Sequence, residues 1–267
     1  MAIQYERMYV DSRFGQMHMR TARPEKRTTN NPLICFHLSP YSSVVYETFV
    51  REMGKDRFCI AIDSPGFGHS DPTPEPPLIP DYSAAMSDVV DALGIERADL
   101  IGFHTGSKVA LELGRQRPDV VNKAILISIA YWTPDEIKNR EVIIKAPEIK
   151  EDGSHLKKAW DGSMRWSMTG RTPMMLAKLF YAHTINPAIT HWGHQAAYQY
   201  DVEAAMDEIK QPILVLNPED DLWNETPRIK PLLKQRGSQF MDLPGWAHGF
   251  MELKTDEFSK IVRDFLD

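Results

Sequence analysis

Short apolar runs separated by segments of helical spacing dominate the chain. Two runs near the N-terminus, residues 5–10 and 17–21, alternate apolar and polar positions around a turn at 12–15. This alternation predicts an antiparallel hairpin. Six later runs are short, mostly apolar and bounded by turn residues, as expected of buried strands. They are residues 32–38, 57–63, 98–103, 122–129, 211–217 and 238–244.

Most of these predicted strands are followed by a segment in which apolar residues recur with a helical period. The predicted helices are residues 42–54, 81–93, 105–115, 226–235 and 254–265. Strands that alternate with helices form parallel sheets, because each crossover returns the chain to the same edge with right-handed sense. The pattern therefore predicts an α/β protein with a doubly wound, mostly parallel sheet of eight strands.

The strand–helix alternation stops near Trp132 and resumes after about Met206. Between these points the chain has helical segments rich in methionine and aromatic residues. A helical insertion between two parts of one sheet is expected to lie over the carboxyl ends of the strands, where ligands bind in open α/β sheets. We therefore predict a core of residues 1–132 and 207–267 and a helical cap of residues 133–206, with an apolar, partly aromatic pocket beneath the cap.

Composition narrows the range of partners. The 267 residues are 42% hydrophobic and 25% charged, enough for one domain with an insertion. The formal net charge of −6 offers no basic surface for nucleic acid. The N-terminal residues do not read as a signal peptide, and no apolar run approaches the length of a membrane span. We expect a soluble, cytoplasmic protein that acts on a small molecule, either as a monomer or as a homo-oligomer.

The sequence predicts neither a metal nor a cofactor. Cys35 and Cys59 lie inside apolar runs and read as small buried hydrophobes rather than as a disulfide or a nucleophile. His191 and His194 have helical spacing, but no third ligand of suitable spacing lies nearby, so a packing or surface role is favoured.

Polar residues gather in four loops that each follow a predicted strand. The loops are residues 37–40, 102–106, 217–221 and 244–250. The carboxyl ends of parallel strands meet at one edge of a sheet, so we expect these loops to lie close together. In the second loop, Gly102 and Gly106 leave room for a tight strand-to-helix turn that lifts the side chain of His104 above the sheet.

With these loops in this order, the chain resembles the α/β-hydrolase superfamily over nearly its whole length. The resemblance is to the cap-bearing branch of epoxide hydrolases, haloalkane dehalogenases, C–C bond hydrolases and small esterases. It rests on the order of nucleophile turn, acid and histidine, and on residues 63–70, which look like the family's loop after the fourth strand. The resemblance implies a hydrolase without a cofactor.

The resemblance also implies roles for individual residues. His248 corresponds to the acid–base group and Asp221 to the carboxylate that orients it, with Asp221 preferred to Asp220 by its spacing from the strand. The backbone N–H groups of Ser39 and Thr105 would form the oxyanion hole. Assigned more loosely to substrate binding are His37, Phe103, Trp132 and Trp246.

Two positions depart from the family pattern. His104 stands where the family has serine, cysteine or aspartate, and Leu38 follows His37 where the family has glycine. A histidine at the nucleophile position leaves three mechanisms, which we rank in the following order. A water activated by His248 attacks the substrate directly, His104 forms an acyl-imidazole, or the two histidines transfer protons in a lyase or isomerase reaction. A receptor that binds a small molecule without turnover is the remaining alternative.

Overall fold

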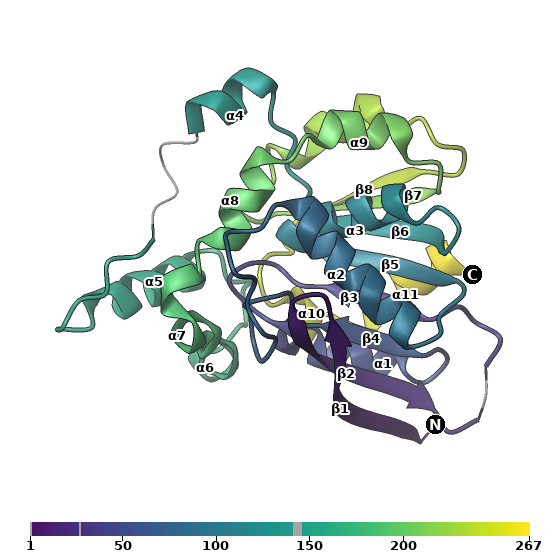
Figure 1. The fold of residues 1–267 in the computed structure, drawn as a ribbon, viewed down its shortest axis with the longest axis horizontal. Coiled ribbons are helices and arrows are strands. Elements are labelled where there is room, and N and C mark those ends of the chain that lie inside the picture. The colour runs from purple at the N-terminus through teal and green to yellow at the C-terminus, as the bar shows by residue number, and fades with distance from the viewer. Residues whose placement is uncertain (1, 27, 141–145) are drawn as a thin grey trace.

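A computed structural model describes residues 2–26, 28–140 and 146–267 of the chain. These residues form an eight-stranded sheet in the order β1-β2-β4-β3-β5-β6-β7-β8 (Figure 1). The β1–β2 and β2–β4 pairs are antiparallel, and the other neighbours are parallel. The predicted fold class and the N-terminal hairpin are confirmed. The strands are β1 Ile3–Ser12, β2 Gly15–Pro24, β3 Leu33–Phe36, β4 Cys59–Ile62, β5 Ala98–Phe103, β6 Val121–Ile127, β7 Ile213–Pro218 and β8 Gln239–Leu243.

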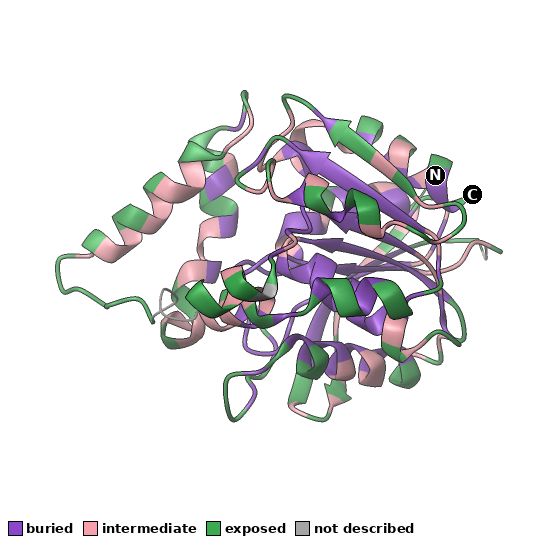
Figure 2. Cartoon of the chain, turned by 90° about the horizontal axis from the view of Figure 1, so that it is seen from above, coloured by how far each residue is buried: buried purple, intermediate pink, exposed green. Residues whose placement is uncertain are grey.

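Helices cover both faces of this sheet, and Figure 2 shows the buried strands between more exposed helices. Two hydrophobic clusters fill the space, one shared with α2, α3 and α9 (Val202–Glu208) and the other with α1 and α11. Successive residues of β3 belong alternately to the two clusters, because side chains of a strand alternate between its faces. The helices outside the insertion are α1 Glu47–Met53, α2 Ile79–Ala92, α3 Thr105–Gln116, α10 Phe250–Leu253 and α11 Thr255–Leu266.

Two predicted helices differ in detail from the structure. The segment predicted over 226–235 is a 3-10 helix, η3 (Thr226–Leu232), with Pro231 inside it. Proline lacks the N–H that an α-helix needs at that point, so a regular α-helix does not form. The segment predicted over 42–54 begins as a 3-10 turn, η1 (Ser43–Tyr46), before α1.

The secondary-structure elements that the structure describes between β6 and β7 are all helices. They form α4 Pro134–Arg140, α5 Ser154–Arg165, α6 Pro173–Phe180, α7 Ala182–Ile185, the 3-10 turn η2 Pro187–Ile189, α8 Trp192–Gln199 and α9 Val202–Glu208. The predicted end of the insertion at residue 206 falls inside α9, which packs against α3. Figure 1 shows α5, α6 and α7 standing beyond one end of the sheet.

The insertion is tied to the loops at that end of the sheet. The N–H of His248 donates to the carbonyl of Trp166 (3.0 Å), and the N–H of Met168 donates to the carbonyl of His248 (2.9 Å). On the other side, the hydroxyls of Ser42 and Tyr181 lie 3.0 Å apart. These contacts hold the helical segment against the loops that follow β3 and β8.

The predicted burial of the two cysteines is confirmed. Cys35 and Cys59 are fully buried free thiols in one apolar cluster, with their sulfurs 3.8 Å apart. Among the described residues, helices of the length and apolar content required to cross a membrane do not occur.

Candidate active site

The turn between β5 and α3 holds His104 in a strained backbone conformation. Its φ of 52° and ψ of −113° are rarely adopted by residues other than glycine. The turn closes tightly, because a methyl group on Gly102 would lie 2.1 Å from the carbonyl oxygen of Gly106. A methyl group on Gly106 would lie 2.0 Å from the carbonyl oxygen of Phe36. Only glycine fits at either position, as the sequence predicted.

Replacing Gly106 with alanine is therefore expected to destabilise the fold. The added methyl group meets backbone of β3 that cannot move aside, so we expect a loss of about 3 kcal/mol in the free energy of unfolding. Urea denaturation followed by circular dichroism measures it. Gly162→Ala in α5 is the matched control, since a methyl group there meets nothing within 4 Å and alanine is the better helix former. Equal stability of the two variants would show that the turn is less tightly closed than described.

Two histidine–aspartate pairs meet above this turn. His104 Nε2 lies 2.9 Å from Asp220 Oδ2 and 3.8 Å from Asp221 Oδ1. His248 Nε2 lies 2.9 Å from the same Asp221 oxygen. The two imidazole rings are 5.2 Å apart between centroids. The sequence analysis anticipated the contact of His248 with Asp221 but not the contact of His104 with Asp220.

Asp220 is held in place from several directions. Its side chain is fully buried. Besides the imidazole of His104, it accepts hydrogen bonds from the hydroxyl of Ser128 (2.6 Å) and the N–H of Leu222 (2.8 Å). Ser128 follows β6 and is itself at a positive φ of 52°. A carboxylate anchored in this way provides a fixed negative charge beneath the His104 ring.

The charged side chains of this cluster shift one another's pKa values. Burial lowers the pKa of His104, but the charge of Asp220, the hydrogen bond to it and the charge of Asp221 outweigh burial, so the pKa is above the ordinary value. Burial raises the pKa of Asp220, and His104, His248 and Ser128 more than reverse this effect. Burial likewise raises the pKa of Asp221, and its histidine partners bring it well below the usual range. The two carboxylates thus stabilise the imidazolium form of His104 relative to the neutral ring.

The same four side chains are the described residues that could hold a metal ion. His104, Asp220, Asp221 and His248 offer two nitrogens and two carboxylate oxygens within 4.8 Å of one another. Such a donor set suits divalent transition metals. However, each of the two nitrogens already lies 2.9 Å from a carboxylate oxygen, so two hydrogen-bonded pairs account for the arrangement without an ion.

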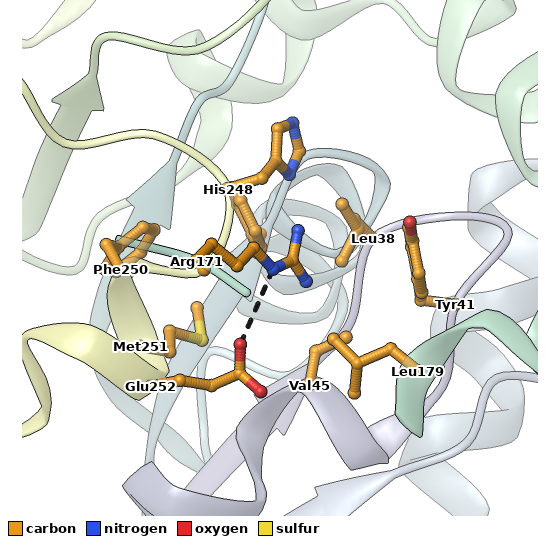
Figure 3. A pocket seen from close by; sticks show the side chains of 11 residues that line it. Leu38, Tyr41, Val45, Arg171, Leu179, His248, Phe250, Met251 and Glu252 are labelled. Carbon is orange, nitrogen blue, oxygen red and sulfur yellow. Dashed lines mark ion pairs between the residues drawn. The ribbon is translucent and has the colours of Figure 1, made fainter. Parts of the chain in front are cut away.

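Two small cavities flank the cluster. One of about 60 Å³ is lined by His104, Thr105, Trp132, His194 and Asp221, among others. The other, of about 30 Å³, is lined by Phe103, His248 and Arg171 and by apolar side chains (Figure 3). The first contains three of the predicted site residues, Thr105, Trp132 and Asp221, beside His104. The second places Phe103 next to His248, with ring centroids 5.5 Å apart.

The remaining predicted site residues lie in the loops that follow β3 and β8. His37 is buried, its Nδ1 is 2.8 Å from the carbonyl of Leu38, and its Nε2 accepts the N–H of Ser64 (2.9 Å). Both ring nitrogens are therefore occupied by backbone and are not available to a substrate. Trp246 packs against Phe250, with centroids 5.6 Å apart. Ser39 is buried in the loop that follows β3.

Sequence reasoning missed or set aside three residues of the site. Spacing from the strand favours Asp221 over Asp220, and the sequence favours packing or the surface for His194, although His194 lines the His104 cavity. Arg171 gives no signal in the sequence, because it is a single arginine in a helical insertion. Its burial beside His248 appears only once the insertion is folded against the core.

The comparison with known proteins agrees with this geometry. A family model described as "alpha/beta hydrolase fold" matches residues 31–151, which include β3 to β6 and the His104 turn. Over this region, a little under half of its length, the chain is similar to the α/β-hydrolase superfamily. Its fold is that of the enol-lactonase from Burkholderia xenovorans LB400, with a TM-score of 0.79, 18% identity and coverage of 97% of this chain and 99% of the lactonase.

Two relatives in sequence match different shares of this chain and of their own length. RutD of Caulobacter sp. (strain K31) is 24% identical over 70% of this chain and 73% of its own length. Carboxylesterase YbfK of Bacillus subtilis (strain 168) is 29% identical over 48% of this chain and 43% of its own length. The chain thus matches less than half of the length of that esterase.

Proposed function

We propose that this α/β-hydrolase-fold protein is a cofactor-free hydrolase that cleaves an ester-like bond next to a carbonyl group in a small, largely apolar substrate. The observation that carries the proposal is the pair of His–Asp contacts above the strained turn, where the family places its nucleophile. The likeness to an esterase and to an enol-lactonase supports an ester or lactone as the substrate class.

In the proposed reaction His248 is the general base. In the serine triad the histidine bonds its acid through Nδ1, whereas here Nε2 of His248 faces Asp221. A neutral ring that donates from Nε2 carries its lone pair on Nδ1. None of the hydrogen bonds among the described residues uses that Nδ1. It would take a proton from a water molecule that attacks the substrate carbonyl, while Asp221 stabilises the resulting imidazolium.

His104 would stabilise the oxyanion that forms as water adds. Its raised pKa favours the imidazolium, which has no lone pair and is a poor nucleophile. We therefore favour direct water attack over an acyl-imidazole. The positive charge of His104, the N–H of Thr105 at the start of α3 and the N–H of Ser39 would together stabilise the developing negative charge. The serine, histidine and acid of the usual mechanism are then replaced by four side chains, those of His104, Asp220, Asp221 and His248.

The test is a set of small 4-nitrophenyl esters, lactones and carbamates hydrolysed in ¹⁸O-labelled water. Direct attack predicts one ¹⁸O in the product carboxylate and an unmodified protein in mass spectra of quenched turnovers. An acyl adduct on His104 would replace this mechanism by the acyl-imidazole route. Solvent deuterium at a substrate carbon without hydrolysis would point to a lyase or isomerase. Tight ligand binding with no turnover of any substrate would point to a receptor.

Removal of metal ions is expected to leave the activity within about twofold of its starting value. The two histidine nitrogens are satisfied by aspartates, so the pairs need no ion to stay in place. Dialysis against a chelator, with the metal content measured by mass spectrometry before and after, tests this expectation. Loss of activity that returns on adding one divalent metal would instead assign these four side chains to a metal centre.

A further inference from the structure

A buried arginine lines the cavity beside His248. Arg171 lies between α5 and α6, and its side chain is 4% exposed. Figure 3 shows its guanidinium pointing into the cavity, with His248 on one side and Glu252 on the other. The neighbouring walls are apolar, formed by side chains that include Leu38, Phe103 and Leu179. A positive charge is therefore buried in an otherwise largely hydrophobic chamber.

The charge of Arg171 is incompletely paired. Its Nε is buried and has no hydrogen-bond partner among the described residues. The nearest oxygen of Glu252 is 3.7 Å from that Nε, too far for a hydrogen bond, and it is also buried without a partner. The other polar contact, from Nη1 to the hydroxyl of Ser167, is long at 3.4 Å. Buried charged groups normally have their hydrogen-bonding capacity satisfied, because leaving it unused is costly.

We infer that Arg171 is the binding site for a carboxylate on the substrate, at the end opposite the bond that is cleaved. This inference rests on the proposed hydrolase function. The guanidinium offers parallel N–H donors that match the two oxygens of a carboxylate. The cavity of about 30 Å³ is large enough for roughly two water-sized groups, the size of those two oxygens.

Because His248 lines the same cavity, its position indicates where the reactive carbonyl of the substrate lies relative to the carboxylate. A molecule with its carboxylate on Arg171 fills this cavity with its two carboxylate oxygens, so its short apolar chain and its reactive carbonyl would extend out of the cavity past His248, which lines the same wall. The substrate class is thus a small ester or lactone that carries a carboxylate at the far end of an otherwise apolar chain. Glu252 is the loose counter-ion that the carboxylate displaces. Burial raises the pKa of Glu252, although Arg171 and Lys178 oppose this effect.

The experiment compares 4-nitrophenyl hydrogen glutarate with its neutral terminal amide, after subtraction of the uncatalysed rates. We expect the wild type to favour the carboxylate ester by about 30-fold in kcat/KM. Arg171→Gln should bring this ratio to about one, chiefly through KM, and Arg171→Lys should give an intermediate ratio. Glu252→Gln should raise the ratio several-fold by lowering KM for the anionic ester. Arg165→Gln, at an exposed arginine of α5, is the matched control and should keep the wild-type ratio.

Binding of glutarate separates failure of this inference from failure of the hydrolase proposal. Glutarate should raise the melting temperature of the wild type, raise that of Glu252→Gln further, and leave that of Arg171→Gln unchanged. If neither ester is hydrolysed but these shifts occur, the carboxylate site stands and the hydrolase proposal falls. If both esters are hydrolysed equally and glutarate has no effect, the hydrolase stands and Arg171 merely holds the fold together. If Arg171→Gln fails to fold, the Arg171→Lys and Glu252→Gln variants test the inference instead. A lower preference for the carboxylate ester in Glu252→Gln than in the wild type would overturn it.

Discussion

His248→Ala is expected to lower kcat about a thousandfold for any substrate that the wild type hydrolyses. The imidazole is the proposed base for the attacking water, and loss of a general base typically costs between about a hundredfold and ten-thousandfold. Asp221 would be left without the ring it orients. Substrate affinity should change little, because the base acts mainly in the transition state. Steady-state kinetics on the best ester, with isothermal titration of a product carboxylate, measures both quantities.

The matched control for this variant is His155→Ala. His155 lies on α5, outside the cluster, and its ring accepts the N–H of Lys150. It should retain the wild-type kcat. If His248→Ala kept more than a tenth of the wild-type kcat, the base would have to be another group. His104 would be the first candidate, since its ring lies closest to that of His248 in the cluster.

Asp220→Asn is expected to destabilise the fold at pH 6 by about 3 kcal/mol and much less at pH 9. Removing one partner of a buried ion pair leaves the other charge uncompensated, a cost of about 3 to 5 kcal/mol. His104 has a raised pKa in the folded state, so its pairing stabilises the protein fully below the unfolded pKa of about 6.5 and ceases to do so as the pH rises through the folded pKa. Asp220 has a lowered pKa in the folded state. Its pairing therefore stabilises the protein at pH values above the ordinary pKa of an aspartate, and this stability is lost as the pH falls through the lowered pKa.

Urea unfolding at the two pH values measures this difference, and imidazole NMR signals follow the pKa of His104 directly. Without the charge of Asp220, burial becomes the dominant influence, and the pKa of His104 should fall. Asp264→Asn on α11 is the control, since its partner Lys260 is exposed and surface pairs contribute little. Equal losses at pH 6 and pH 9 would mean that His104 is not charged when paired with Asp220.

Much of the architecture could be predicted from the sequence because it depends on local patterns. Apolar runs bounded by turn residues located the strands, and the two-residue period of the first hairpin identified its pairing. A helical period predicts an α-helix less reliably where proline interrupts it. The segment Thr226–Leu232, which contains Pro231, is a 3-10 helix. Gly102 and Gly106 marked the turn correctly, because their role follows from the absence of a side chain.

The candidate site was predictable only in part. The order of the loops brought His104, Asp221 and His248 to one edge of the sheet, as expected when parallel strands end together. The same reasoning assigned His37 to the substrate, although its two ring nitrogens are bound to backbone. Which atoms a ring faces depends on the loop's path, and loop conformation is not encoded in a hydrophobic period.

By itself, the sequence determined the α/β fold, the strained turn and the set of polar loops, because periodicity, glycine positions and strand order act locally or through topology. The tertiary structure alone decided how the two neighbouring aspartates divide between the histidines, since adjacent side chains leave the backbone in different directions. It alone also placed Arg171 in the cavity beside His248. An arginine is usually solvent-exposed, and this one is buried only because the helical insertion packs its segment against the core.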